Sequence, residues 1–415
     1  MHQNHKLTVT DGIVILLFAI AATWFCAGFY YPDPYAFHRF GEGLVLLLVW
    51  AARIVTPLVS GGILFIYIMV RTGRLSSTKA LLMAGSTLAS LLLLYPVGSF
   101  VYSRNNNIEQ KIKYYHPYLQ LTPPLPKQTS ADSSGIHIFC LGGSTTEYAD
   151  KKGGGWVGRT EKLLRERTGR TDVVVHNLGR QWFTSLHTLI NYETNLRHYK
   201  PRLIIVMHAI NDLLQNADHS YLSHGPFRED YGHFYGPVTR LILNKGFLRE
   251  VFGSMRLWYS TPRETIETHE FPGLVSFERN LSTLLDLAQK DGTAVALMTQ
   301  PTLLKDTMSL QEQRVLHMVA VETYGPKKKW SYATASRGMK AYNNCTKNVA
   351  KTRGVTLIDL AQAVPQTLDY FWDDVHYNET TYTFISEFVV SELLRQNVLD
   401  HLLKNTPPDK HSRSP

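Results

Sequence analysis

Five short apolar runs, each rich in β-branched residues, recur between residues 135 and 403. They are 136–141 (IHIFCL), 172–177 (DVVVHN), 202–208 (RLIIVMH), 293–299 (TAVALMT) and 355–360 (VTLIDL). Segments with a helical pattern separate them, such as WVGRTEKLLRER and FERNLSTLLDLAQKDG. Strands that are apolar almost throughout and alternate with helices are typical of a parallel sheet covered on both faces. The sequence therefore predicts an α/β domain over residues 135–403.

Polar and glycine-rich segments follow these strands at the edge where parallel α/β sheets bind their ligands. Three such segments directly follow predicted strands, and a fourth polar segment lies near the carboxyl end. They are Gly142–Thr146 (GGSTT), Asn177–Arg180 (NLGR), His208–Asp212 (HAIND) and Trp372–His376 (WDDVH). Each one alone has an ordinary structural explanation, because a serine after glycines can form a turn and an Asn-Asp pair can cap a helix. Their joint placement at one edge of one sheet favours a functional site.

The order of these four segments resembles that of the SGNH (GDSL) hydrolase superfamily over residues 135–400. Its signatures are a serine beside glycine, a glycine, an Asn-Asp pair and an Asp-x-x-His. The resemblance implies a flavodoxin-like three-layer α/β/α fold and an esterase. It also implies roles for five residues, namely Ser144 as nucleophile, Gly179 and Asn211 as oxyanion donors, and His376 with Asp373 as the rest of a catalytic triad.

The residue chemistry agrees with these roles. A serine hydroxyl is a weak nucleophile until a neighbouring base accepts its proton, and the ordinary pKa of a histidine such as His376 suits that task near neutral pH. Asp373 lies three residues before His376, so its carboxylate can orient the ring. The backbone N–H groups of Ser144 and Gly179 and the amide of Asn211 can donate to the oxyanion.

Two positions depart from the family pattern. Gly143 stands where the family usually has an aspartate before the serine, which preserves the turn and removes an acid that the triad does not need. Trp182 stands where the family often has a small residue, and we expect it to narrow or reshape the pocket. A domain that keeps this fold only to bind or scaffold a glycan is therefore an alternative of a different class.

We expect the remaining titratable and thiol groups near these motifs to have structural roles and not catalytic ones. We expect Asp374 to be solvated or at a helix start, and His208 to be a packed residue near the site. The three cysteines are scattered, which favours buried, inert thiols. Neither metal-ligand spacing nor a cofactor motif is evident, so we predict no metal and no cofactor.

Three long apolar segments precede the α/β domain and form a predicted membrane domain over residues 1–102. They are 12–31, 43–70 and 80–102, and each is long enough to cross a bilayer as a helix. The loop between the second and third carries Arg71, Arg74 and Lys79 with no acid, which by the positive-inside rule places the amino terminus in the cytoplasm. A cleaved signal peptide is the alternative for the first segment, but no clear cleavage site follows it.

The remaining segments are connections. Residues 103–134 contain TPPLP and are predicted to be a linker, and residues 404–415 a disordered tail. Residues 215–271 are a long insertion whose amphipathic stretch either packs as a cap over the site or lies on the bilayer surface.

The net charge of +9 is spread along the chain without a dense basic run, which argues against nucleic-acid binding and fits an anionic bilayer or polysaccharide. The leading hypothesis is a serine esterase anchored in the bacterial cytoplasmic membrane, its catalytic domain periplasmic or otherwise extracytoplasmic. Its substrate would be an ester on an envelope glycan, lipid or small molecule. The alternative within the same chemistry is an O-acyltransferase that modifies a polysaccharide and receives acyl groups from a membrane partner.

Overall fold

The structure is a computed structural model, and it describes ten ranges of the chain. These are residues 8–30, 54, 61–83, 85–86, 119, 121–126, 135–150, 154–215, 264–316 and 328–404. They fall in two compact units, one amino-terminal and one containing the α/β domain. The predicted tail began at residue 404, which is instead the last residue of a helix. Residues 405–415 and most of the predicted linker lie outside the described ranges. Within that linker segment, Leu119 is fully buried.

All five predicted strands form one parallel sheet. The strands are β1 (Ile136–Gly142), β2 (Val173–Gly179), β3 (Leu203–Met207), β5 (Ala294–Met298) and β7 (Thr356–Ile358). They lie in the order β2-β1-β3-β5-β7, and each neighbouring pair is parallel. This is the flavodoxin-like order, in which the sequence of strands reverses between β1 and β3. The predicted α/β class with a central parallel sheet is confirmed.

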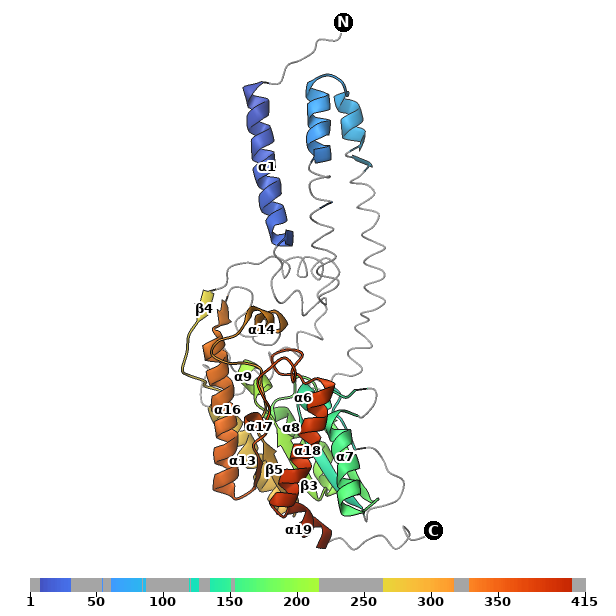
Figure 1. Ribbon diagram of the computed structural model, residues 1–415, viewed down its shortest axis with the longest axis vertical. Coiled ribbons are helices and arrows are strands. Elements are labelled where there is room, and N and C mark those ends of the chain that lie inside the picture. Colours follow the sequence, from blue (N-terminus) through green and yellow to red (C-terminus); the bar gives the residue numbers. More distant parts are fainter. Residues whose placement is uncertain are drawn as a thin grey trace. The chain divides into compact units, whose positions relative to one another are not determined.

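Two layers of helices cover the sheet (Figure 1). On one face α7 (Gly155–Thr168) packs against α18 (Glu379–Arg395), and on the other α13 (Leu274–Lys290) packs against α8 (Ser185–Asn191) and α16 (Tyr332–Arg353). The spacing of apolar residues explains why α13 faces the sheet. Phe277, Leu281, Leu284, Leu285 and Ala288 recur at helical intervals and are all buried.

Shorter elements complete this unit. They are α6 (Ser144–Glu147), η1 (Tyr192–Leu196), η2 (Arg197–Tyr199), α9 (Ile210–Gln215), α14 (Leu310–Val315), α17 (Leu360–Ala363) and α19 (Val398–Lys404). Helices α6 and α9 directly follow β1 and β3, so both begin at the carboxyl edge of the sheet.

A second, two-stranded sheet was not predicted. β4 (Glu264–Ile266) pairs in parallel with β6 (Lys328–Trp330). β4 lies near the end of the predicted 215–271 insertion, and β6 lies in the connection between β5 and α16. The pair therefore links two long connecting segments that are distant in sequence. The amphipathic stretch of the insertion falls within 216–263, outside the described residues.

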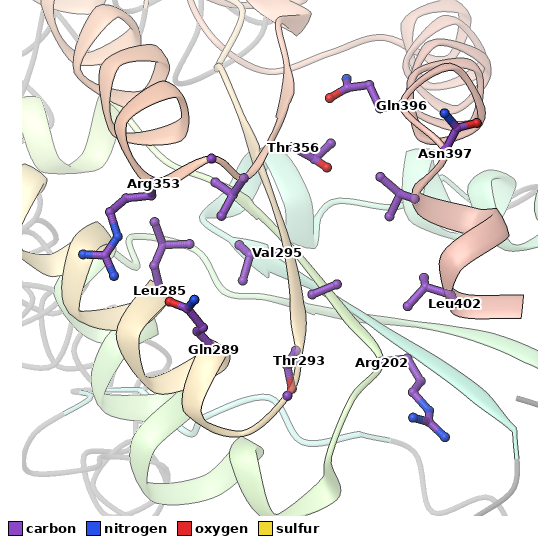
Figure 2. Close-up of a pocket in the computed structure, with 15 residues that line it drawn as sticks. Arg202, Leu285, Gln289, Thr293, Val295, Arg353, Thr356, Gln396, Asn397 and Leu402 are labelled. Carbon is purple, nitrogen blue, oxygen red and sulfur yellow. The ribbon is translucent and has the colours of Figure 1, made fainter. Parts of the chain in front are cut away.

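The opposite edge of the main sheet holds a cavity of about 500 Å³ (Figure 2). Residues at the amino ends of strands line it, among them Arg202 before β3 and Thr293 before β5. Arg353 contributes from the end of α16, and Asn397 from the turn between α18 and α19. The cavity is therefore separate from the edge where the predicted site residues follow their strands.

The amino-terminal unit contains α1 (Val9–Tyr30) and helical segments at 61–71 and 77–83. Asp11 links the first two, because its carboxylate accepts hydrogen bonds from the Tyr67 hydroxyl at 2.7 Å and from Arg71 Nε at 2.6 Å. α1 covers most of the first predicted span, whereas much of the other two lies outside the described residues. Across the residues that the structure describes, no helix combines the length and apolar character that crossing a membrane requires.

Candidate active site

The structure brings three of the predicted residues into one hydrogen-bonded row. Ser144 Oγ lies 2.7 Å from His376 Nε2, and His376 Nδ1 lies 2.6 Å from Asp373 Oδ2. Ser144 is 5% exposed, His376 4% and Asp373 0%, so bulk water does not compete for these hydrogen bonds. The distances are those at which a histidine can accept a serine proton while a carboxylate fixes its other ring nitrogen.

The turn that carries Asp373 and His376 is held by the aspartate itself. Its Oδ1 accepts the backbone N–H groups of Val375 at 2.8 Å and His376 at 2.6 Å. Burial pushes the pKa of the Asp373 carboxyl up, but the adjacent His376 and these hydrogen bonds outweigh burial, so the pKa lies below its usual range. The three-residue spacing thus lets one ionised carboxylate both shape the turn and orient the imidazole.

Glycines before Ser144 allow neighbouring segments to lie close to the chain between β1 and α6. A Cβ at Gly142 would lie 2.7 Å from the carbonyl oxygen of Met207, and one at Gly143 would lie 2.6 Å from Asn211 Nδ2. A side chain at Gly142 would therefore displace the backbone at Met207, and one at Gly143 would displace the Asn211 amide. The second contact also shows that the Asn211 amide lies directly beside the residue that precedes Ser144.

The two other predicted oxyanion donors lie at the same edge. Gly179 ends β2 and is paired in register with Gly142 of β1. Its N–H donates to Asn177 Oδ1 at 3.2 Å, a long bond that an additional acceptor could share. Asn211 is buried, and its Nδ2 donates to the Phe183 carbonyl at 2.9 Å. Because an amide nitrogen has two hydrogens, one remains for another acceptor.

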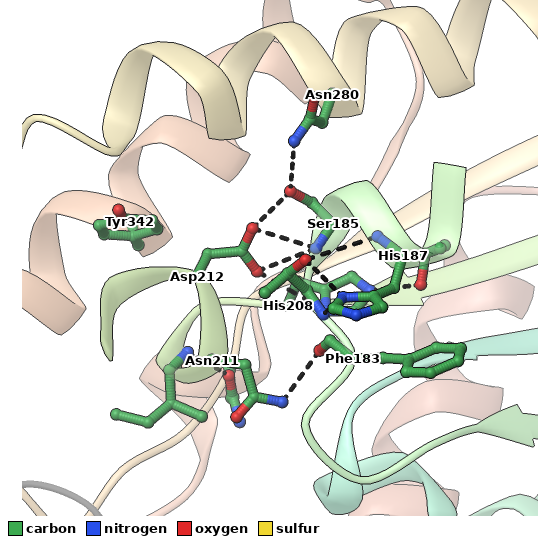
Figure 3. Close-up of polar contacts among 12 residues, drawn as sticks. Phe183, Ser185, His187, His208, Asn211, Asp212, Asn280 and Tyr342 are labelled. Carbon is green, nitrogen blue, oxygen red and sulfur yellow. Dashed lines mark hydrogen bonds and ion pairs between the residues drawn. The ribbon is translucent and has the colours of Figure 1, made fainter. Parts of the chain in front are cut away.

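A buried polar cluster lies behind Asn211 (Figure 3). The Asp212 carboxylate accepts hydrogen bonds from the backbone N–H and the hydroxyl of Ser185, and Asn280 Nδ2 donates to the same hydroxyl at 3.1 Å. Asp212 thereby ties α9 to the first residue of α8. The Ser185 hydroxyl donates to the Asp212 carboxylate and not to an imidazole. The hydrogen bonds of this cluster therefore hold two helices together and do not activate the serine.

His208 belongs to the same buried region. Its Nε2 lies 2.7 Å from Thr188 Oγ1, and its Nδ1 lies 3.9 Å from the Asp212 carboxylate. Burial lowers the pKa of His208 to about 3, so the ring is neutral near pH 7. Its position agrees with the prediction of a packed residue near the site.

Glu147 is a residue that the sequence analysis missed. It lies three residues after Ser144 and accepts hydrogen bonds from Arg180 Nη1 at 2.9 Å and from the backbone N–H of Gln181 at 2.6 Å. Glu147 thus joins the nucleophile helix α6 to the segment that follows Gly179. An acid one helical turn after a candidate nucleophile was the available sequence signal.

Asp374 corrects one expectation. It was expected to be solvated or at a helix start, yet it is 0% exposed and the next long helix begins at Glu379. Its backbone carbonyl accepts hydrogen bonds from Leu303 N at 2.9 Å and Thr302 Oγ1 at 2.8 Å. The loop after β5 covers this turn, and sequence spacing could not reveal that cover.

Aromatic rings surround the imidazole. The rings of Tyr148 and Trp372 both stack near His376, with centroids 4.8 Å and 5.0 Å from its ring. Trp182 lies partly buried against the core with φ of 65°, a left-handed conformation that is unusual for a bulky residue. Within the described ranges, no group of three His, Cys, Asp or Glu side chains is placed to hold a metal ion.

A hydroxyl, an imidazole and a carboxylate joined in this way are what acyl transfer through a serine requires, and the chain is a serine hydrolase that acts on ester bonds. The model of the GDSL-like lipase/acylhydrolase family matches residues 140–384, and the chain belongs to that family. The resemblance inferred from the four motifs is thereby confirmed.

Several solved structures are similar to this chain at low sequence identity. An acetyl xylan esterase is 15% identical, with 62% of this chain and 98% of that chain covered and a TM-score of 0.38. The lipase/acylhydrolase from Enterococcus faecalis is 16% identical, with 63% and 96% covered and a TM-score of 0.37. The acetylxylan esterase Axe2 from Geobacillus stearothermophilus is 15% identical, with 63% and 94% covered and a TM-score of 0.37. No curated protein matches the sequence significantly.

Proposed function

We propose that Ser144, His376 and Asp373 are the catalytic triad of an esterase that removes acyl or acetyl groups from an envelope glycan, a lipid or a small molecule. The observation that carries this proposal is the row of hydrogen bonds from Ser144 Oγ through His376 to Asp373. The family gives the reaction class, since its description names lipases and acylhydrolases.

The reaction has two steps, acylation of Ser144 by the ester and hydrolysis of the acyl-enzyme by water. Ser144 Oγ attacks the ester carbonyl while His376 Nε2 accepts the serine proton, and the carbonyl oxygen becomes an anion. The anion collapses, the alcohol leaves with the proton from His376, and the acyl group stays on Ser144. Water then attacks this acyl-enzyme, gives a proton to His376, and the carboxylic acid leaves as Ser144 regains its proton. Asp373 stabilises the imidazolium in both steps.

The oxyanion is stabilised by the Asn211 amide and the backbone N–H groups of Ser144 and Gly179. The amide lies beside Gly143, next to the nucleophile, and has a hydrogen to donate. Because the Gly179 N–H already donates to Asn177, we assign Asn211 the larger share of the oxyanion stabilisation. Loss of such a donor typically lowers kcat about 10²- to 10³-fold.

A fluorophosphonate probe tests the proposal directly. Full-length protein is labelled beside Ser144→Ala and His376→Ala, and the labelled residue is located by mass spectrometry. We expect label on Ser144 that both variants lose. Well-folded wild-type protein that takes no label would contradict the triad and favour the non-catalytic glycan-binding or scaffolding alternative, in which Ser144→Ala retains binding.

Hydrolysis and acyl transfer share the same acyl-enzyme, so an O-acyltransferase remains the second candidate. In that case a sugar hydroxyl replaces water in the second step, and a membrane partner supplies the acyl donor. Product analysis with a competent donor, with and without the acceptor sugar, separates the two. An acylated sugar supports the transferase, whereas free acid alone supports the esterase.

We also propose that the amino-terminal unit anchors the domain in a bacterial cytoplasmic membrane, with the catalytic domain outside. Supporting observations are the apolar segments of the sequence and the exposure of Leu16, Leu17 and Ile20 on α1, at 60%, 61% and 57%. Such side chains are costly to expose to water and not to lipid. A reporter fused after Tyr102 that is active only in the cytoplasm would overturn this topology.

A further inference from the structure

Gln300 is a buried glutamine at the carboxyl edge of the sheet that none of the four motifs includes. It lies two residues beyond the end of β5 and is 2% exposed. Asn343 of α16 fixes its backbone from both sides, because Asn343 Oδ1 accepts from Gln300 N at 2.8 Å and Asn343 Nδ2 donates to Gln300 O at 3.0 Å. The point from which the Gln300 side chain extends is therefore held firmly.

The side chain of Gln300 joins the two turns that carry the proposed nucleophile and oxyanion donor. Its Oε1 accepts from the backbone N–H of Ile210 at 2.9 Å, and its Nε2 donates to Thr145 Oγ1 at 3.1 Å. Ile210 directly precedes Asn211, and Thr145 directly follows Ser144. One amide thus contacts the immediate neighbour of each group.

The strand order explains why a side chain of this length is needed. β3 lies between β5 and β1 in the sheet, so Gln300 starts beyond β5 and contacts residues that follow both other strands. Neighbouring strands are about 4.8 Å apart. An asparagine has the same amide on a side chain that is one methylene shorter, and it cannot maintain both contacts from the same backbone position.

We infer that Gln300 is a positioning residue that sets the distance between Ser144 and the Asn211 amide. The inference rests on the proposed function of those two residues. Thr145 and Ile210 are each 2% exposed, so water does not replace the hydrogen bonds that a substitution removes. A displacement of a catalytic group by about 1 Å can cost about 10²-fold in rate.

The test compares kcat and KM for hydrolysis of p-nitrophenyl acetate by full-length wild type, Gln300→Met and Gln300→Asn. Methionine keeps the length of the glutamine side chain and removes both hydrogen bonds. Asparagine keeps the amide on a side chain that is one methylene shorter. Active sites are counted by fluorophosphonate labelling, so that unfolded protein does not lower the apparent kcat. We expect both variants to lose about 10- to 100-fold in kcat with KM within about twofold of wild type.

Gln396→Met is the matched control. Like Gln300, Gln396 forms a side-chain hydrogen bond to the backbone of another segment, since its Nε2 donates to the Leu357 carbonyl at 2.8 Å, but it lines the cavity at the opposite edge. Its substitution should lower the unfolding temperature and leave kcat unchanged. If Gln300→Met lowers only the unfolding temperature, as expected for Gln396→Met, then Gln300 has a structural role alone and the inference is wrong.

A double-mutant cycle shows whether Gln300 acts through Asn211. In the Asn211→Ala background the amide is already gone, so Gln300→Met should cost less than about threefold in kcat. A full loss in that background would overturn the inference while leaving the triad intact. Failure of wild type to label at Ser144 would instead overturn the proposed function, and the inference with it.

Discussion

Asp373 has two roles, since its two carboxylate oxygens contact the imidazole and the backbone of the same turn. Replacement by asparagine nearly preserves the shape and removes the charge. The amide can also present N–H to His376 Nδ1 and thereby favour the wrong tautomer.

We therefore expect Asp373→Asn to lower kcat on p-nitrophenyl acetate about 10³- to 10⁴-fold, by analogy with other serine triads. Asp291→Asn is a control, because Asp291 pairs with Arg197 away from the site. Equal kcat values for Asp373→Asn and wild type would show that Asp373 does not orient the base.

His208 gives the folded state a dependence on pH. Burial lowers its pKa from the ordinary 6.5 to about 3, so between these values the unfolded chain binds a proton that the folded chain does not. The stability that neutral His208 contributes is complete above about pH 6.5 and is lost as the pH falls toward 3.

We expect the free energy of unfolding to fall with acid between pH 6 and 4, with His208 contributing up to about 1.4 kcal/mol per pH unit. Denaturant titration of His208→Gln should show that part of the slope removed. His269→Gln, at an exposed position, serves as control. An unchanged slope in His208→Gln would mean that other groups cause the acid sensitivity.

At the scale of elements, the carboxyl edge is held together by side chains that link one turn to another. Glu147 links α6 to the segment after β2, and Asp212 links α9 to α8. These ties bring together groups that are far apart in sequence.

Glu147→Ala should separate α6 from the turn after Gly179. Loss of a buried or half-buried hydrogen-bond partner typically costs about 1–3 kcal/mol, so we expect a lower unfolding temperature together with about a tenfold lower kcat. Glu147→Gln, which keeps an acceptor for Gln181 N–H, should recover most of both. If Glu147→Gln is as impaired as Glu147→Ala, then the charge opposite Arg180, rather than the hydrogen bond, is what matters.

Sequence patterns predicted the strands and helices better than the side-chain contacts that link them. The strands were recognisable because nearly continuous β-branched runs seldom form other structures. Ser144 was recognisable because it follows such a run beside two glycines, and His376 because it belongs to an Asp-x-x-His motif. Gln300 and Asn343 were not recognisable, because a glutamine and an asparagine outside a motif look the same whether they are buried or exposed. The burial of Asp374 depends on the loop after β5, and the β4–β6 pair depends on two distant segments meeting.

At the scale of the whole molecule, the α/β unit contains its own sheet and one continuous buried core. The residues of the proposed triad and oxyanion site all belong to this unit. Its chemistry should therefore not require the amino-terminal helices.

We predict that a fragment of residues 112–415 folds and is labelled by a fluorophosphonate at Ser144 with a rate within about threefold of the full chain, because a domain of this size can bury a sufficient core. The same fragment with Ser144→Ala is the control. A fragment that folds, by circular dichroism, and remains unlabelled while the full chain reacts would show that the amino-terminal unit completes the site.

The β4–β6 pair also bears on how this chain can have diverged. Glu264–Ile266 and Lys328–Trp330 share one strand register, so a shift of either segment by one residue would exchange the faces of its side chains. We therefore expect insertions and deletions to be selected against within the two paired segments. Among homologues, the residues of these two three-residue segments should covary.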